Sequence, residues 1–354
     1  MSGASGVTLL STVGIIANPA SGKDLRRVIA SGITVTNAVK ENAVQRMLLA
    51  MDAMGVDRAW LMPDRSNLSR RVLDAVAGEL LSLEVAEVDM PYVLGTQDDS
   101  MRTVTRMAEL GVDLLIVLGG DGTSRVVSKC CGDIPILPVS TGTNNVFPQM
   151  IEGTLIGMAA AALATGKVTV DEVCRRAPRL DLVDESGVLV DHALVDLAVI
   201  DVLDTAARAV WEAESIRELY LTQARIDSIG MSAIGAKVEP LAPYSGRACR
   251  LLLGRGGETI TAPIAPGLLA ELSVSEYRQF TTGETLAIAS TPCVIALDGE
   301  RELAIPRGKN CGVCYNPDGP LVVDVRKTLR LANRREREAI CGAVRVQNDL
   351  RIGD

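Results

Sequence analysis

The sequence is poor in histidine and in aromatic side chains, and it contains no long apolar run. Histidine occurs once, as His192, and aromatic residues make up only 3% of the chain. A Ser-His-Asp triad would have to use His192, but this residue lies inside the strand-like run LVDHALVDLAVI and no nucleophile-elbow motif accompanies it. No stretch approaches the roughly 20 consecutive apolar residues of a membrane-spanning helix. Neither triad hydrolysis nor a membrane partner is therefore expected.

Positive charge is also scarce. The chain has 36 Lys and Arg residues against 44 Asp and Glu residues, which gives a formal net charge of -8. Nucleic acids and acidic membranes bind positive surfaces, so neither is an expected partner, whereas a phosphorylated small molecule needs only a local positive patch. Segment 1–23 lacks the basic flank and the long apolar core of a signal peptide. We therefore expect a cytoplasmic protein with reduced thiols.

The eight cysteines show no clear framework for disulfides or zinc. Cys130 and Cys131 are adjacent, which favours free thiols. Cys311 and Cys314 form a lone CxxC, which a redox centre or half of a zinc site would use, and no second CxxC follows. Because a structural zinc site normally needs four ligands, metal binding here is the minor alternative.

Length and hydrophobic pattern predict two domains. The chain has 354 residues, of which 47% are hydrophobic. Up to the alanine-rich helix 153–166, strand-like runs alternate with amphipathic helical segments, which specifies an α/β domain with a parallel sheet. Strand-like runs with turns such as DESG and GRGGE follow, typical of antiparallel hairpins, with a helix predicted over 204–222. We predict an α/β domain over 1–166, completed by the helical tail 325–354, and a β-rich domain over 167–324.

Three polar or glycine-rich loops follow strand-like runs of the first half. The segment 119–123 (GGDGT) leaves the apolar run 113–118, and Thr123 is expected to cap the helix that SRVVSKC begins. The segments 17–23 (ANPASGK) and 138–148 (PVSTGTNNVFP) follow two other runs, and no Walker A spacing is present. Loops at the carboxyl ends of parallel strands meet at one edge, where a helix N-terminus favours phosphate. For GGDGT alone, a tight turn with a solvated aspartate is the alternative.

The three loops together resemble motifs of the superfamily of NAD kinases, diacylglycerol kinases and sphingosine kinases. Its hallmarks are Asn-Pro-x-Ser-Gly, Gly-Gly-Asp-Gly-Thr and Gly-Thr-x-Asn loops, which segments 18–22, 119–123 and 142–145 match, with Val146 where the lipid kinases usually have Asp. More narrowly, GIIANPASGKDLRRVIA, LGGDGTSRVV and STGTNNVFP resemble the acetoin catabolism protein X group of NAD-kinase-like proteins. The resemblance implies the two-domain NAD-kinase-like fold.

The second half resembles the NAD kinases less closely. The segment 232–240 (SAIGAKVEP) stands where NAD kinases carry Ser-Ala-Gly-Gly-Pro-x-x-x-Pro, and Gly267 replaces the histidine of Pro-Ile-x-Pro-His-Ser-Leu. The NAD-binding Asn-Glu pair falls near Val195 and Asp196, which keeps the acid and loses the amide. The segment 298–300 reads Asp-Gly-Glu, the lipid-kinase form. The resemblance is specific in the phosphate half and eroded in the half that selects the acceptor.

The resemblance implies a phosphotransferase that moves a phosphoryl group from ATP or polyphosphate to NAD(H) or a related metabolite, linked to acetoin catabolism. Asp121 is the predicted catalytic residue, as the base for the acceptor hydroxyl or as a holder of Mg²⁺, and Glu300 is a predicted magnesium ligand. The predicted donor-binding residues are Asn18, Ser21, Lys23, Gly119, Gly120, Gly122, Thr123, Thr141, Gly142, Thr143 and Asn145. The predicted acceptor-binding residues are Asn144, Asp196, Ser232 and Ala233.

Two other function classes stay open. A kinase of a different small molecule fits the eroded acceptor motifs, and a nucleotide-binding regulator without turnover fits the phosphate loops alone. The carboxylate of Asp121 favours an enzyme, since mere binding would not need it. The resemblance also implies a homodimer or higher homo-oligomer formed through the β-rich domain. We expect a nucleotide or phosphate in the cleft between the domains, contacted by segment 119–123.

Overall fold

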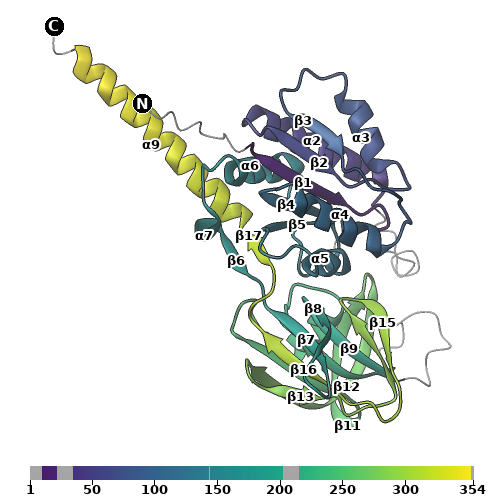
Figure 1. Ribbon diagram of the computed structural model, residues 1–354. Helices are drawn as coiled ribbons and strands as arrows, with labels where there is room; N and C mark the ends of the chain where they lie inside the picture. The colour runs from purple at the N-terminus through teal and green to yellow at the C-terminus, as the bar shows by residue number, and fades with distance from the viewer. Residues whose placement is uncertain (1–9, 22–34, 143, 202–214, 352–354) are drawn as a thin grey trace.

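The computed structural model describes residues 10–21, 35–142, 144–201 and 215–351. Figure 1 shows a mixed α/β part above a part made almost entirely of strands. The first, here called the α/β part, contains a seven-stranded sheet with the order β3-β2-β1-β4-β5-β17-β6. The second, the β-rich part, contains a six-stranded and a four-stranded sheet. The predicted combination of an α/β domain with a β-rich region is therefore confirmed.

Parallel pairing dominates the seven-stranded sheet. β1 pairs in parallel with both β2 and β4, and β5 joins β4 in the same sense. β4 has the sequence LLIVLG and is buried along its whole length, as expected where helices cover both faces of a parallel sheet. The elements in chain order are β1 (Thr12–Ala17), α2 (Asn37–Ala53), β2 (Arg58–Leu61), α3 (Leu68–Val76), β3 (Glu84–Glu87), α4 (Gln97–Glu109), β4 (Leu114–Gly119), α5 (Asp121–Ser128), β5 (Ile136–Ser140), α6 (Gly153–Ala164) and α7 (Val170–Val173).

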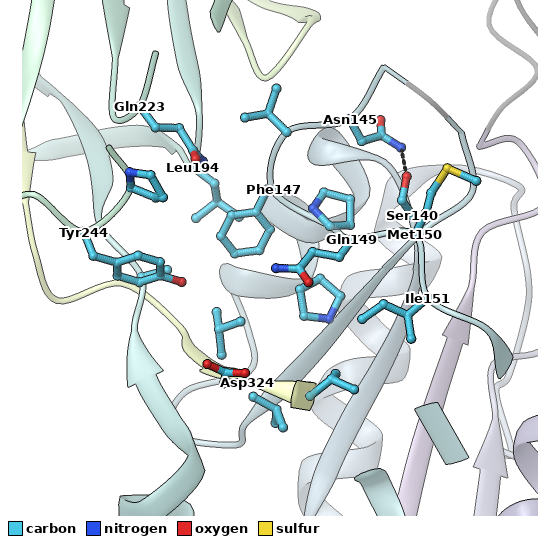
Figure 2. A pocket seen from close by; sticks show the side chains of 18 of the residues that line it. Ser140, Asn145, Phe147, Gln149, Met150, Ile151, Leu194, Gln223, Tyr244 and Asp324 are labelled. Carbon is cyan, nitrogen blue, oxygen red and sulfur yellow. Dashed lines mark hydrogen bonds between the residues drawn. The ribbon is translucent and has the colours of Figure 1, made fainter. Parts of the chain in front are cut away.

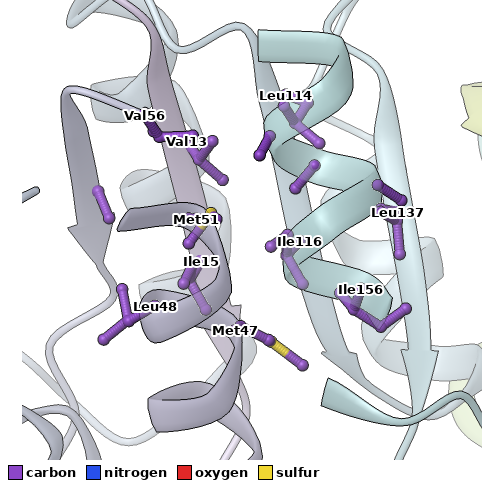
Figure 3. Close-up of a cluster of buried hydrophobic side chains, with 14 of the residues drawn as sticks. Val13, Ile15, Met47, Leu48, Met51, Val56, Leu114, Ile116, Leu137 and Ile156 are labelled. Carbon is purple, nitrogen blue, oxygen red and sulfur yellow. The ribbon is translucent and has the colours of Figure 1, made fainter. Parts of the chain in front are cut away.

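Aliphatic side chains from the sheet and from α2 and α6 form the main core of the α/β part. Figure 3 shows Met47 and Met51 of α2 beside Ile15 and Ile116 of the sheet, with Ile156 of α6 in the same cluster. The small residues of α6 let the two helices approach closely, because a Cβ built on Gly157 would lie 2.4 Å from the carbonyl oxygen of Met47. This packing covers one face of the sheet and leaves its carboxyl edge open for the loops.

The β-rich part is antiparallel. Its sheets have the orders β12-β11-β10-β9-β14-β15 and β13-β16-β7-β8, and buried side chains from both sheets share one core. Residues 216–221 form β10, so the helix predicted over 204–222 is wrong there, and residues 202–214 lie outside the described residues. The remaining elements of the chain, which include β6, β17 and α9 of the α/β part, are in chain order β6 (Cys174–Arg176), β7 (Arg179–Asp184), β8 (Leu189–Ala193), β9 (Asp196–Asp201), β10 (Ile216–Leu221), α8 (Met231–Val238), β11 (Arg247–Ala265), β12 (Leu268–Thr281), β13 (Thr285–Ala287), β14 (Cys293–Leu297), β15 (Glu300–Ile305), β16 (Cys311–Asn316), β17 (Leu321–Val323) and α9 (Val325–Arg351).

Two short strands on the segments that join the parts belong to the seven-stranded sheet. β17 pairs in parallel with β5, and β6 pairs antiparallel with β17. The tail is helical as expected, and Val325 and Ala332 of α9 belong to the core of the α/β part. We therefore propose domain limits near residues 177 and 320, instead of those first expected at 166 and 325. Within the described residues, no helix combines the length and the apolar character needed to cross a bilayer.

The CxxC segment lies on β16. Residues three apart on a strand face opposite sides of a sheet, so Cys311 and Cys314 are not placed to pair. Cys311 is buried, whereas Cys314 is half-buried with its Sγ 3.1 Å from Oγ1 of Thr285. Of the eight cysteines, the seven other than Cys341 are free thiols in the structure.

Candidate functional site

The GGDGT segment forms the turn from β4 into α5. Gly119 ends the strand, Gly120 is the N-cap in an extended conformation, and the helix begins at Asp121. The expectation that Thr123 caps the helix is therefore wrong, because Thr123 lies inside the first turn. A Cβ built on Gly119 would lie only 2.4 Å from the Cβ of Thr123, so the turn requires glycine at this position. The backbone N–H groups of the first turn of α5 are thus placed at the carboxyl edge of the sheet.

The first loop, residues 18–21, is hydrogen-bonded to the other two loops. Asn18 donates from Nδ2 to Oγ1 of Thr123 at 3.0 Å, and its Oδ1 accepts from the N–H of Ala20 at 2.9 Å. The hydroxyl of Ser21 lies 3.1 Å from that of Thr141. The loops predicted to bind a donor are therefore in direct contact, although they lie more than 100 residues apart in the chain.

Lys40 is hydrogen-bonded to the backbone of the first loop, and it is not among the site residues predicted from the sequence. Its side chain lies on α2 and is only 1% exposed. The ammonium donates to the carbonyl oxygens of Asn18, Pro19 and Ser21 at 2.8, 3.1 and 2.6 Å. A buried ammonium needs such partners, because an uncompensated buried charge is strongly unfavourable. Among the described residues, Lys40 thus places a positive charge directly beneath the loop, whereas Lys23 lies outside the described residues.

The third loop, residues 140–147, packs on the GGDGT turn through Asn145. Nδ2 of Asn145 donates to Oγ of Ser140 at 2.7 Å, and a Cβ built on Gly120 would lie 2.9 Å from Oδ1 of Asn145. The hydroxyl of Ser140 in turn donates to the carbonyl oxygen of Gly142 at 2.6 Å. Thr141 is buried, and Thr143 lies outside the described residues. Asn145 therefore lies where it fixes the spacing between the two loops.

Asp121 connects the start of α5 to the third loop by hydrogen bonds. Its carboxylate accepts from the N–H groups of Val146 at 3.1 Å and Phe147 at 2.8 Å. The alternative interpretation, a tight turn with a solvated aspartate, does not describe this geometry, because the carboxylate is hydrogen-bonded to the backbone of the third loop. The residue singled out for chemistry also has a structural role, since it holds the loop that separates α5 from the cavity described below.

Glu300 reaches the GGDGT turn from the β-rich part. Its Oε1 lies 2.6 Å from the place where a Cβ on Gly122 would be, so a larger residue at this position would require the Glu300 side chain to shift. Its Oε2 lies 3.5 Å from Nη2 of Arg125, whose positive charge opposes a cation at the same place. Within the described part of the chain, no three His, Cys, Asp or Glu side chains converge as metal ligands. These residues do not fit a magnesium site built by the protein, and the proposal below uses no metal step.

The predicted acceptor residues lie around the boundary of the two parts. Ser232 is 1% exposed; its hydroxyl donates to the carbonyl oxygen of Gln223 at 3.1 Å and accepts from the N–H of Arg225 at 3.0 Å. Ala233 is also buried, next to it on α8. Asp196 begins β9 and is buried, whereas Asn144 is half-buried in the third loop. The side chain of Ser232 is therefore engaged within the protein and shapes the cavity wall through Gln223 and Arg225.

A cavity of about 540 Å³ lies between the two parts. Figure 2 shows Phe147 and Gln149 of the α/β part facing Gln223 and Tyr244 of the β-rich part, with Asp324 below. The third loop lines this cavity, whereas residues 119–123 are not among the lining residues. The contact of segment 119–123 with a bound nucleotide or phosphate therefore stays a prediction. The loop held by Asp121 forms the wall between the GGDGT turn and the cavity.

The charges at the cavity favour an anion. Three arginines line it, Arg175, Arg225 and Arg326, together with the carboxylate of Asp324. Arg225 is paired with Asp227 at 2.9 Å, so the excess of positive charge comes from Arg175 and Arg326. The guanidinium of Arg175 lies 3.4 Å from the ring centre of Tyr244, a cation–π contact. Burial raises the pKa of Tyr244, and the nearby Arg175 acts in the opposite direction. Together with Phe147, this wall offers an aromatic surface beside positive charge, which suits a planar anionic metabolite.

Comparisons with known proteins give the following similarities. Residues 13–168 match the family model of the ATP-NAD kinase N-terminal domain, and residues 179–318 match that of the acetoin catabolism protein X C-terminal domain. The chain is 37% identical over 332 residues to acetoin catabolism protein X of Cupriavidus necator, covering 91% of this chain and 92% of that protein. A crystal structure of yeast NADH kinase complexed with NADH is similar over 92% of this chain and 87% of that one, with 14% identity and a TM-score of 0.45.

Proposed function

The chain belongs to the acetoin catabolism protein X family, with an N-terminal domain of the ATP-NAD kinase type, and on this premise we propose that it is a phosphotransferase acting on a small molecule. The donor in this proposal is ATP or polyphosphate, and the acceptor is NAD(H) or a related hydroxylated metabolite of acetoin catabolism. The observation that carries the proposal is the hydrogen-bonded convergence of three loops at the N-terminus of α5. A positive helix terminus surrounded by backbone N–H groups is suited to phosphate.

The α/β part provides the donor side of the proposed reaction. The turn from Gly119 to Thr123 presents the N-terminal end of α5, and the first loop lies beside it with Lys40 underneath. Bound donor supplies the phosphoryl group, and phosphoryl transfer depends mainly on positioning and charge stabilisation. The tightly bonded loops satisfy that requirement, because they are held in place before any ligand arrives.

The third loop connects the donor side with the acceptor side. Its residues line the cavity on one side and are held by the Asp121 carboxylate on the other. In the proposal, the acceptor occupies the cavity near Phe147 and Gln223, and Asp121 accepts the proton of its hydroxyl when the third loop shifts. A positioned carboxylate typically contributes about 10²- to 10⁴-fold to such a step.

A nucleotide-binding regulator is the second candidate. It is favoured by the hydrogen bonds that Asp121 makes to two backbone N–H groups, because these engage the proposed base within the protein. A regulator needs the phosphate loops and the cavity but no turnover. The eroded acceptor motifs also keep a kinase of a different small molecule open.

The decisive experiment combines binding with turnover. Melting temperature is measured with ATP, ADP, polyphosphate, NAD, NADH, NADP and thiamine diphosphate, since a ligand at about 100 times its Kd stabilises the fold by roughly 2.7 kcal/mol. Labelled donor is then incubated with each candidate acceptor. Donor binding with phosphorylated acceptor supports the kinase, donor binding without product supports the regulator, and no nucleotide binding contradicts both. The predicted homo-oligomer is tested separately by light scattering at micromolar concentration.

A further inference from the structure

Arg125 is a fully buried arginine at the boundary of the two parts. It lies on α5, four residues after Asp121, and its side chain has no exposed surface. Figure 1 shows α5 on the side of the α/β part that faces β8 and β15. A buried guanidinium is costly unless negative groups surround it, so its partners define what it does.

Three carboxylates of the β-rich part surround this guanidinium. Nη1 lies 3.3 Å from Asp191, Nη2 lies 3.5 Å from Glu300, and Nε lies 3.8 Å from Asp298. Asp191 lies on β8, Asp298 lies in the turn between β14 and β15, and Glu300 is the first residue of β15. β8 belongs to one sheet and β14 and β15 to the other. One side chain of the GGDGT helix thus meets both sheets of the other part.

Asp298 extends this contact to the backbone near the cavity. Its carboxylate is fully buried and accepts from the N–H groups of Leu194, Val195 and Asp196 at 2.8, 2.7 and 3.1 Å. Leu194 also lines the cavity. A continuous chain of contacts therefore runs from Gly122 and Arg125 on α5 to the cavity wall of the β-rich part.

The same face of α5 carries two further contacts across the boundary. Lys129 donates to Asp191 at 2.8 Å, and Oγ of Ser128 lies 2.7 Å from Nε2 of His192. The boundary cluster of Arg125, Lys129, Asp191, Asp298 and Glu300 then holds two positive and three negative side chains. Removal of Arg125 would leave the carboxylates of Asp191 and Asp298, which are largely buried, and that of Glu300, which is half-exposed, close together with one cation. Repulsion between them is unfavourable, most of all for Asp191 and Asp298.

We propose that Arg125 is a positioning residue that couples the GGDGT turn to the β-rich part by holding Asp298 and Glu300 against α5. It sets the place of Glu300 over Gly122 and the place of the backbone at 194–196 beside the cavity. The predicted effect of Arg125 on catalysis rests on the proposed function, because only a donor and an acceptor held by different parts need this alignment. The predicted effect of Arg125 on the boundary between the two parts does not depend on the proposed function.

Hydrogen exchange of the backbone amides tests the proposal without any assay of turnover. In Arg125→Met, the amides of 194–196 and of the third loop at 146–147 should exchange roughly tenfold faster or more, while those of the β11–β12 hairpin keep the parent's rate. Lys129→Met is the matched control, because it removes a cation of the same helix that contacts Asp191 alone among the three carboxylates. Its amides at 194–196 should exchange within about threefold of the parent's rate.

Two further variants separate charge from packing. Glu300→Gln added to Arg125→Met removes one of the repelling carboxylates, so it should recover at least part of the protection; a purely packing role gives no recovery. Where Arg125→Met does not fold, Arg125→Lys keeps the charge on a shorter group and should show intermediate exchange. Unchanged exchange at 194–196 in the folded variant, or equal loss of protection throughout the protein, overturns the proposal.

Kinetics then connects the boundary to catalysis. Arg125→Met should lower kcat about tenfold or more with a smaller change in KM for the donor, since the donor loops remain bonded to one another. Normal kcat together with faster exchange at 194–196 overturns the catalytic consequence and leaves the boundary role standing. An inactive parent protein contradicts the proposed function, and the exchange result still decides the role of Arg125.

Discussion

In the α/β part, the site residues lie on three loops at the ends of β1, β4 and β5, which are neighbours in one sheet. In the β-rich part, the groups that face them come from a strand of one sheet and a turn of another, as Asp191 and Asp298 show. A parallel sheet gathers the loops after its strands at one edge, whereas antiparallel hairpins spread their turns over both ends. The two parts therefore contribute to one site by different physical routes.

The difference also shows in the type of contact. The loops of the α/β part contact one another mainly through neutral hydrogen bonds and glycine contacts, such as Asn18 to Thr123 and Gly120 to Asn145, and through the hydrogen bonds that the Asp121 carboxylate accepts. The boundary with the β-rich part depends on buried charge around Arg125. The residues that make the first kind of contact lie in short motifs that can be read in the sequence. The second depends on how two separately built units meet.

The largest effect is expected for Asp121→Asn, which tests whether the α/β part carries the chemistry. Loss of the carboxylate should reduce turnover about 10²- to 10⁴-fold. The free energy of unfolding should also fall by about 1.5–3 kcal/mol, because the carboxylate accepts hydrogen bonds from the N–H groups of Val146 and Phe147. Initial rates and urea unfolding of both proteins measure the two effects. Undiminished turnover would rule out Asp121 as the base.

Lys40→Met tests whether the first loop depends on the buried ammonium. Three backbone carbonyl oxygens lose a charged donor, so the free energy of unfolding should fall by about 3 kcal/mol. Donor affinity should fall as well, because the loop loses its support and the nearby charge. Lys327→Met on the exposed surface of α9 is the control and should lie within about 0.5 kcal/mol of the parent. Equal stability of the two variants would contradict the role of Lys40.

His192→Gln tests the boundary between the parts through pH. Burial lowers the pKa of His192 to about 4, so the unfolded chain binds a proton between about pH 6.5 and 4 that the folded protein does not. Stability therefore falls with acidification in this window, by about 2 kcal/mol at pH 5 from this residue. In the variant, the free energy of unfolding should change less between pH 7.5 and 5. If the free energy of unfolding has the same pH dependence in both proteins, the folded protein binds a proton at His192 as readily as the unfolded chain does, and the lowered pKa is contradicted.

The smallest effect is expected within the β-rich part. Cys314 faces away from Cys311 on β16, so the pair has no shared redox role in this structure. Cys314→Ser should change the free energy of unfolding by less than about 0.5 kcal/mol, with Cys311→Ser as the buried comparison that costs more. Thiol titration of the folded parent should find no Cys311–Cys314 disulfide. A disulfide that forms readily would contradict the strand geometry.

The conformation of much of the three-loop region could be predicted from the sequence, because each loop has a local cause. The run LLIVLG predicts a buried strand, and the glycines after it predict a tight turn into a helix. The sequence predicts a cap at Thr123 because a side-chain oxygen is the commoner N-cap, and no sequence pattern indicates the extended backbone of Gly120, which is the N-cap in the structure. The domain limits proposed from the structure differ from those expected from the sequence, because β6 and β17 are too short to show a hydrophobic period.

The groups missed by sequence reading are those whose meaning depends on a distant partner. Lys40 is one polar residue in an amphipathic helix, where a lysine ordinarily faces solvent, and only the first loop above it explains its burial. In the sequence, Arg125 is an ordinary helix residue shortly after GGDGT. In the structure, three carboxylates that lie 66 to 175 positions further along the chain surround it. No local sequence pattern predicts such a contact.

The sequence by itself determined the parallel sheet, the three polar or glycine-rich loops and the family to which the chain belongs, because hydrophobic period and glycine placement act over a few residues. Only the tertiary structure decided that Asp121 holds the third loop, that this loop separates the GGDGT turn from the cavity, and that buried charge joins the two parts. Those features depend on the low dielectric and the exact distances created when remote segments pack together, and neither exists before the chain has folded.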